Sequence, residues 1–399
     1  MGQVRWAGWT MAVATALVIA GVQGARADVA SDKPAAILVY PKIVVDSTVG
    51  VDTVIRLTNT NRTTPINVHC FFVNANSHCT DTGAICTDAS TCGFGLCLPG
   101  WVETDFDIIL TARQPIQWKA SQGLPSTDQD VPLPFGICTG NQFIRCGSDV
   151  DCAQFGAGTC TQSNVGTRIP PVAEDPFVGE LKCIAVDVNG TPIARDELKG
   201  EANIETSTEG NLDVASYNAI GIQSTTKSGG AIANNPLMLG PGSNGDYNGC
   251  PNVLILNNFF DTAIDPVSGD TITTDLTLVP CSEDFLRQIG GSAVVQYLVF
   301  NEFEQRFSTS RAVNCFQEIQ LCNIDTPQCA HSIFNVAVAG TLTGQTRLTP
   351  IGIPPLASGL LGVAIERHTP DAKTTLTRSA AFNLHFAGAR DNADTITLP

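Results

Sequence analysis

The chain has 399 residues, of which 15% are charged, and it carries a formal net charge of −16 at pH 7. An acidic protein repels nucleic-acid phosphates and anionic lipid head groups, so the charge argues against a nucleic-acid-binding or membrane-surface protein. The low charged fraction and slightly positive mean hydropathy exclude wholesale disorder, and the length is sufficient for two domains.

The N-terminal segment predicts a secretory signal peptide, residues 1–27. Arg5 precedes an apolar run over residues 7–22, and the small-x-small triplet at 25–27 follows. This order of features is typical of a signal peptide that is cleaved after its last small residue, and the apolar run is short for a transmembrane helix. We expect a mature chain that begins at Asp28, has no transmembrane span, and is secreted, periplasmic, extracellular or attached to the cell surface. An uncleaved anchor is the alternative.

Residues 28–223 are predicted to form a first antiparallel β-sandwich. Stretches rich in Val, Ile, Phe and Thr, bounded by turn residues, indicate strands. These stretches are residues 35–45, 52–61, 66–75, 106–121 and 177–188. The last of them meets Asn189-Gly190, a strong hairpin signal. Because no long stretch has a helical period, the sequence predicts an all-β fold.

The 15 cysteines all follow the predicted signal peptide, so disulfides are their expected state. Zinc is the competing interpretation, but no Cys-x2-Cys pair occurs and residues 138–160 contain no histidine. Segments 79–97 and 138–160 each hold four cysteines, with five residues between the second and third and Phe-Gly before the last. We interpret them as two copies of one small module inserted into the first sandwich, with chance similarity as the alternative.

We expect each module to pair its own cysteines and the first sandwich to have one further bridge. The disulfide candidates are Cys79, Cys86, Cys92 and Cys97 in the first module, Cys138, Cys146, Cys152 and Cys160 in the second, and Cys70 with Cys183. Five cysteines remain in the second half of the chain, so at least one thiol there is predicted to be free or to pair between chains.

Residues 224–249 are rich in Gly, Asn and Pro, which predicts an interdomain linker or a long ordered loop. Strand patterns resume beyond this segment. Residues 250–399 are therefore predicted to form a second β-sandwich domain.

Residues 35–75 contain a strand that ends in Leu57-Thr58-Asn59-Thr60 and turns through a loop with Pro65 into the next apolar strand. This stretch resembles the opening strands of bacterial immunoglobulin-like surface and periplasmic domains. The resemblance implies an Ig-like sandwich with a scaffolding or binding role. The cysteine-rich insertions depart from the pattern.

Catalytic motifs of serine hydrolases, zinc peptidases, P-loop proteins and dinucleotide-binding proteins are absent from the sequence, and no cofactor is expected. Glu302 and Glu304 lie two apart in a predicted strand, so both would face one side and resemble the paired carboxylates of a glycosidase. A charge-balanced strand face is the alternative. Glu366, His368 and His385 offer metal-ligating side chains, but a simple hairpin would leave the two histidines about 16 Å apart.

The sequence therefore predicts a secreted, disulfide-stabilised protein of two Ig-like β-sandwich domains that serves as a binding, adhesion or structural module. Its expected partner is a protein or a glycan at a cell surface, and not a nucleic acid. The alternatives are a secreted glycan hydrolase that uses Glu302 and Glu304, and a subunit of a cell-envelope assembly.

Overall fold

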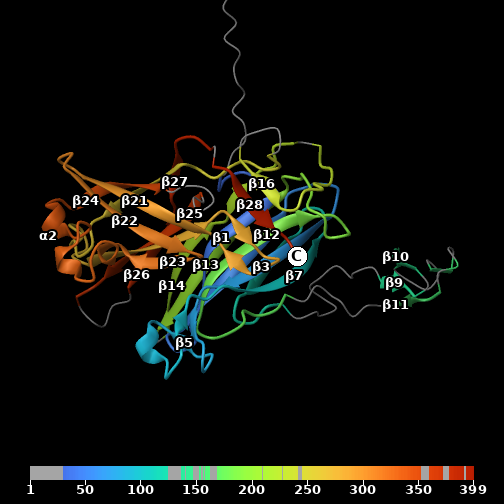
Figure 1. Cartoon of the computed structure of the whole chain (residues 1–399), viewed down its shortest axis with the longest axis horizontal. Coiled ribbons are helices and arrows are strands. Elements are labelled where there is room, and N and C mark those ends of the chain that lie inside the picture. The colour runs from blue at the N-terminus through green and yellow to red at the C-terminus, as the bar shows by residue number, and fades with distance from the viewer. Residues whose placement is uncertain are drawn as a thin grey trace, which may run out of the picture.

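The computed structural model confirms the all-β fold (Figure 1). It describes residues 30–124, 136–139, 141–146, 152–153, 156, 158–161, 169–208, 210–226, 228–240, 245–351, 359–371, 377–390 and 392–399. The predicted signal peptide lies outside these residues. Within them, no helix has the length and apolar character needed to cross a membrane. The helical elements whose bounds are described are short: η1 (Ala89–Thr91), η2 (Leu321–Asn323), η3 (Cys329–His331) and α2 (Val336–Ala339).

Two antiparallel sheets make up most of the first half. The first sheet has the order β15 (Ile220–Ile222), β1 (Ile37–Val45), β12 (Phe177–Val186), β3 (Ile66–Asn74) and β7 (Val102–Leu110). The second sheet has the order β14 (Asn211–Asn218), β13 (Leu198–Thr208), β2 (Val51–Asn59) and β8 (Pro115–Lys119). Strand β1 contacts β2 and β13, so the two sheets pack face to face in a sandwich-like arrangement.

A second pair of sheets follows, drawn mainly in orange in Figure 1. The third sheet has the order β22 (Arg306–Asn314), β21 (Ser292–Asn301), β24 (Thr343–Ile351), β17 (Val253–Phe259) and β27 (His385–Ala387). The fourth sheet has the order β23 (Gln317–Gln320), β18 (Thr271–Pro280), β25 (Leu360–Thr369) and β26 (Arg378–Asn383). Leu254 and Tyr297 of the third sheet share an apolar core with Leu276 and Ala364 of the fourth.

Strands that face water on one side alternate between buried apolar side chains and more exposed ones. In β21, Ala293, Val295, Tyr297 and Val299 are buried, and Gln296 between them is exposed. This period of two is that of a half-buried strand.

Strand β1 is instead buried along nearly its whole length, because β18 and β25 of the fourth sheet contact it in addition to the second sheet. The largest apolar core therefore contains residues from both halves of the chain. Its members from the second half are Cys250, Val279, Cys281, Phe285, Leu361, Val363, Ile365, Ile396 and Leu398.

A small bridging sheet also joins the two halves. Its order is β16 (Leu237–Leu239), β28 (Asp394–Thr397), β19 (Glu283–Asp284) and β20 (Ile289–Gly290). Strand β16 lies inside residues 224–249, the segment for which the sequence predicts a linker or a long ordered loop. Phe285, which follows β19, stacks on Phe71 of the first sheet at 4.1 Å between ring centres. The bridging sheet thus lies against the outer face of the first sheet.

The two cysteine-rich segments have the same strand topology. In the first, β4 (Ser77–Cys79) lies between β5 (Ile85–Cys86) and β6 (Cys97–Leu98), and in the second, β9 (Gly136–Cys138) lies between β10 (Asn141–Cys146) and β11 (Cys160–Thr161). In both, the first cysteine is the backbone partner of the fourth: Cys79 pairs with Cys97, and Cys138 pairs with Cys160. This common register supports the interpretation that the two segments are copies of one module.

Disulfides close the first module and cross the first sheet. The bonded pairs are Cys79–Cys92, Cys86–Cys97 and Cys70–Cys183, with Cys250–Cys281 and Cys322–Cys329 in the second half. Cys152 is also disulfide-bonded, while the side chains of Cys138, Cys146 and Cys160 lie outside the described residues. Among the described cysteines, Cys315 is the free thiol.

Candidate ligand-binding pocket

A cavity of about 660 Å³ is lined by residues of both the third and the fourth sheet. Its walls contain three aromatic rings, from Phe259, Phe300 and Phe382, together with amide, carboxylate and imidazole side chains. A concave site with apolar walls and a few converging polar groups is the usual form of a small-ligand site.

The cavity lies where the chain passes from one sheet to the other. The backbone N–H of Leu384 donates to the Gly362 carbonyl of the fourth sheet at 3.1 Å, whereas the next residue, His385, pairs with Ile255 of the third sheet. Strand β27 therefore accompanies β17 only over residues 253–255. Residues 257–259, which line the cavity, have β24 as their one partner strand within the described parts of the chain.

The aromatic side chains come from three strands and are all partly buried. Phe300 ends the solvent-facing series of β21, and the guanidinium carbon of Arg347 lies 5.8 Å from the centre of its ring. The Phe259 ring meets His368 edge-on at 6.3 Å between ring centres. Partly exposed rings in a concave wall provide flat apolar surface to a ligand at little cost in conformational entropy.

The amide groups of the cavity form a chain of hydrogen bonds across two strands. Gln345 donates through Nε2 to Oδ1 of Asn257 at 3.2 Å, and its Oε1 accepts from Nε of Arg347 at 3.3 Å. Asn257 and Gln345 are also backbone partners in β17 and β24. These contacts orient the two amides toward one another and leave part of each available to a ligand, since an amide has more hydrogen-bonding sites than these contacts use.

Two carboxylates line the cavity, and each has a partner within the protein. Glu302 accepts hydrogen bonds from the backbone N–H of Thr343 at 3.1 Å and from its hydroxyl at 2.5 Å. Glu366 lies 2.8 Å from Nε2 of His368, whose Nδ1 lies 3.1 Å from Asp265. Both carboxylates are therefore held in defined orientations.

The predicted strand location of Glu302 and Glu304 is wrong. Strand β21 ends at Asn301 and β22 begins at Arg306, so both glutamates lie in the connecting turn. Asn301 makes this turn, because its Oδ1 accepts the N–H groups of Phe303 and Gln305. Glu302 lines the cavity, Glu304 does not, and the second carboxylate of the cavity is Glu366.

The three residues of the predicted metal site also lie differently from the simple hairpin. His368 pairs with Arg378, and Ala380 is the partner of Glu366. Glu366 and His368 are in contact, and His385 lines the cavity with Glu366 from the neighbouring sheet.

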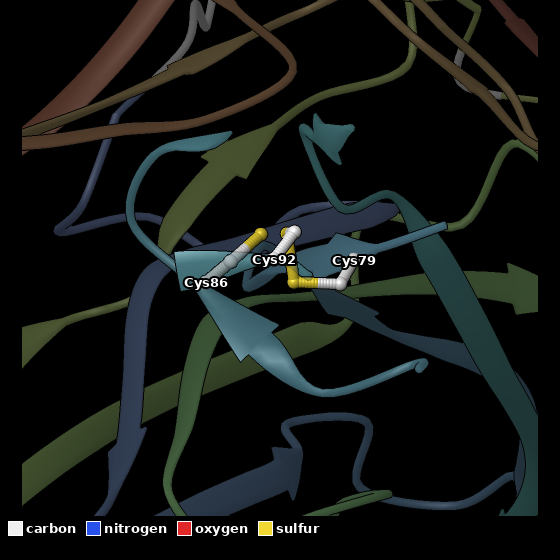
Figure 2. A group of neighbouring side chains, drawn as sticks. All are labelled: Cys79, Cys86 and Cys92. Carbon is white, nitrogen blue, oxygen red and sulfur yellow. A yellow bond between two sulfur atoms is a disulfide. The ribbon is translucent and has the colours of Figure 1, made fainter. Parts of the chain in front are cut away.

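Within the described residues, three groups of side chains have ligand atoms close enough to hold a metal ion, and none contains Glu366, His368 or His385. Each group includes cysteines that are disulfide-bonded, as in the group of Cys79, Cys86 and Cys92 in Figure 2. A metal requires thiolate sulfur, so these groups are disulfide clusters rather than metal sites.

Sequence reasoning missed most of the cavity. Phe300 could have been noticed in the sequence, because the alternation of β21 places it on the solvent-facing side, where a large aromatic residue is unusual. Asn257, Gln345 and Phe382 left no such signal, since their common location depends on how distant strands pair.

No protein-family model matches this chain, and no curated protein has a significantly similar sequence.

Proposed function

We propose that this protein is a secreted binding module, built from two Ig-like β-sandwich domains, that recognises a neutral glycan at a cell surface through the cavity between the third and fourth sheets. The observation that carries the proposal is the combination of three partly exposed aromatic rings with oriented amides and carboxylates in one concave site. The stapled modules and the remaining disulfides suit a protein that works outside the cytoplasm.

The chemistry of the cavity matches that of a sugar. The C–H face of a pyranose ring is apolar and packs on aromatic rings, while its hydroxyls both donate and accept hydrogen bonds. Side-chain amides such as those of Asn257 and Gln345 can meet both needs, and carboxylates such as Glu302 accept from hydroxyls. Because both carboxylates of the cavity already have partners in the protein, the ligand need not carry a positive charge.

A secreted glycan hydrolase is the second candidate, since Glu302 and Glu366 place two carboxylates in one cavity. Hydrolysis needs one carboxyl to donate a proton to the glycosidic oxygen and the other to act as base or nucleophile. Both groups are instead engaged by Thr343 and His368, an arrangement that suits orientation of a ligand better than proton transfer.

Calorimetric titration with cellohexaose, xylohexaose, chitohexaose and maltohexaose tests the proposal. We expect one of these oligosaccharides to bind, and Gln345→Ala to weaken its binding about 5- to 10-fold, the effect of one or two lost hydrogen bonds. Gln296→Ala is the matched control, because Gln296 is an exposed glutamine of the same sheet that does not line the cavity. Absence of binding by the whole panel, or equal affinity in both variants, would contradict the proposal.

The same samples separate binding from hydrolysis. Chromatography of the oligosaccharide after long incubation should show it unchanged. If shorter sugars appear with the parent protein and disappear with Glu302→Gln, the hydrolase is the correct function.

A further inference from the structure

Three charged side chains form a cluster inside the contact between the first sheet and the bridging sheet. The side chains of Glu180 and Lys182 are each 1% exposed, and that of Glu283 is 0% exposed. Nζ of Lys182 lies 2.5 Å from Oε2 of Glu283 and 3.7 Å from Oε1 of Glu180. Glu180 and Lys182 are two apart on β12 and so share one face, while Glu283 comes from β19 in the other half of the chain.

The surroundings of this cluster are apolar. Nζ of Lys182 lies 5.9 Å from the centre of the Phe285 ring, which stacks on Phe71 and lies 5.6 Å from Trp101 between ring centres. The charged groups of the cluster are therefore shielded from hydration by bulk water. Buried ions are stable only when their neighbours compensate the loss of hydration.

The neighbours compensate this loss only in part, because the single ammonium group of Lys182 faces the carboxyl groups of both Glu180 and Glu283. Neither oxygen of Glu180, nor Oε1 of Glu283, has a hydrogen-bond partner within the described residues. Burial raises the pKa of Glu180 well above its ordinary value, and the charge of Glu283 raises it further, against the opposing effect of Lys182. Burial thus favours the protonated, neutral form of Glu180, whose carboxyl group lies beside the contact between Lys182 and Glu283.

We propose that Lys182 and Glu283 form an intramolecular amide bond, with Glu180 as the proton carrier. The bond would join β12 of the first sheet covalently to β19 of the bridging sheet. It is independent of the glycan-binding function proposed above.

The reaction is a condensation that releases one water molecule. Lys182 first transfers an ammonium proton to the Glu283 carboxylate across their contact, which leaves an amine beside a carboxylic acid. The amine nitrogen then attacks Cδ of Glu283, and the C–N bond forms while Glu180 donates its proton to the oxygen that becomes negative. Glu180 next takes a proton from the nitrogen.

The C–O bond to one hydroxyl then breaks. Glu180 supplies the proton with which that hydroxyl leaves as water, and regains the proton of the other hydroxyl, which restores the C=O bond. No oxidant, reductant or co-reactant is consumed, and Glu180 ends in its starting state.

Two features of the site favour this condensation. Holding the reacting groups in contact replaces an encounter between molecules by a local step, which raises the effective concentration of the amine greatly. The product also removes two charges from an apolar interior, where they are costly. The step occurs once in the life of each molecule, so a slow rate suffices.

A second buried lysine provides the matched control. Lys42 of β1 is 2% exposed and also reaches across to the other half, where it contacts Glu318 of β23. The Glu318 side chain is 28% exposed, so water can hydrate its carboxylate. This pair also joins the two halves of the chain, but the lysine here contacts one partly exposed carboxylate instead of lying between two fully buried carboxyl groups.

Mass spectrometry of the secreted full-length chain, after denaturation, reduction and alkylation, tests the amide bond. We expect the intact mass to fall one water molecule short of the mass calculated for the alkylated mature sequence, and a protease digest to contain the Lys182 peptide joined to the Glu283 peptide. A mass equal to that calculated for the alkylated mature sequence, with both peptides recovered separately, would overturn the proposal without any variant.

Variants then assign the roles. Lys182→Met and Glu180→Gln should each have the full sequence mass, whereas Lys42→Met should keep the deficit of one water. Glu180→Gln that is secreted with native disulfides and still lacks one water would show that Glu180 is not the proton carrier. Loss of the deficit in Lys42→Met would show that the deficit does not arise at Lys182.

Discussion

The cavity and the buried charge cluster both gather carboxyl groups from strands that are distant in the chain, but water reaches only the cavity. In the cavity, Glu302 is exposed and accepts hydrogen bonds from the N–H and hydroxyl of Thr343. In the cluster, neither oxygen of Glu180 has such a donor within the described residues. Oriented, hydrated carboxylates suit contact with an exchanging ligand, whereas an uncompensated buried acid affects the stability and chemistry of the protein itself.

The largest effect on the free energy of unfolding is expected when Lys182 of the buried cluster is replaced. Lys182→Met removes the proposed amide bond and leaves Glu283 as a buried carboxyl group without a lysine partner, so we expect the free energy of unfolding to fall by at least about 3–5 kcal/mol. Lys119→Met is the control, because Lys119 pairs with Glu205 with a side chain that is 43% exposed, and such surface pairs contribute at most about 1 kcal/mol. Urea denaturation of both variants measures the difference. Equal losses would mean that the cluster is hydrated and does not differ from a surface pair.

A smaller effect should follow from pH at Glu103 of β7. This half-buried carboxyl has an Oε2 without a partner among the described residues, and burial together with the charges of Asp105 and Glu283 raises its pKa to about 7. A raised pKa means that the folded protein binds the proton more tightly than the unfolded chain. The stability that this provides is present below the ordinary pKa of 4.5 and is lost as the pH rises through about 7.

We therefore expect Glu103→Gln to gain stability relative to the parent between pH 5 and pH 7.5, by on the order of 1 kcal/mol after allowance for partial solvent screening. Urea denaturation of both proteins at pH 5 and pH 7.5 measures this gain in stability. Asp261, whose pKa burial raises to about 6, titrates in the same window in both proteins, so the difference between them isolates Glu103. If the difference in free energy of unfolding between Glu103→Gln and the parent is the same at pH 5 and pH 7.5, Glu103 is hydrated and its pKa is not raised.

The smallest stability effect is expected in the cavity. Asn257→Ala removes an exposed side chain whose contact is with another partly exposed amide, so the free energy of unfolding should change by less than about 0.5 kcal/mol. Its affinity for the oligosaccharide should nevertheless fall as in Gln345→Ala. A large loss of stability would mean that the amide chain serves the fold rather than a ligand.

The all-β fold was predictable because strands such as β21 alternate between buried and exposed side chains. The sharing of one core between the halves was not, because the continuous apolar run of β1 shows only that both its faces are covered and not by what. The charged pair Glu180 and Lys182 inside the otherwise apolar β12 was a visible signal. Their partner Glu283 could not be inferred, since it lies 101 residues beyond Lys182 in the sequence.

The cavity was predictable only in part. The sequence drew attention to Glu302, Glu366 and His385, all of which line it. Their arrangement was missed because it depends on Asn301, which ends β21 in a turn, and on Leu384, where the chain changes sheets by bonding to the distant Gly362. Periodicity describes a strand but not the residue at which it leaves one sheet for another.

Hydrogen exchange of the parent protein, with and without the oligosaccharide that binds most tightly, tests the central claim most directly. If the cavity is the binding site, the sugar should slow exchange in the segments of β17 and of β26 and β27, and leave residues 79–97 unchanged. Protection confined to residues 79–97, or absent from β17, β26 and β27 at saturating sugar, would show that the ligand binds elsewhere.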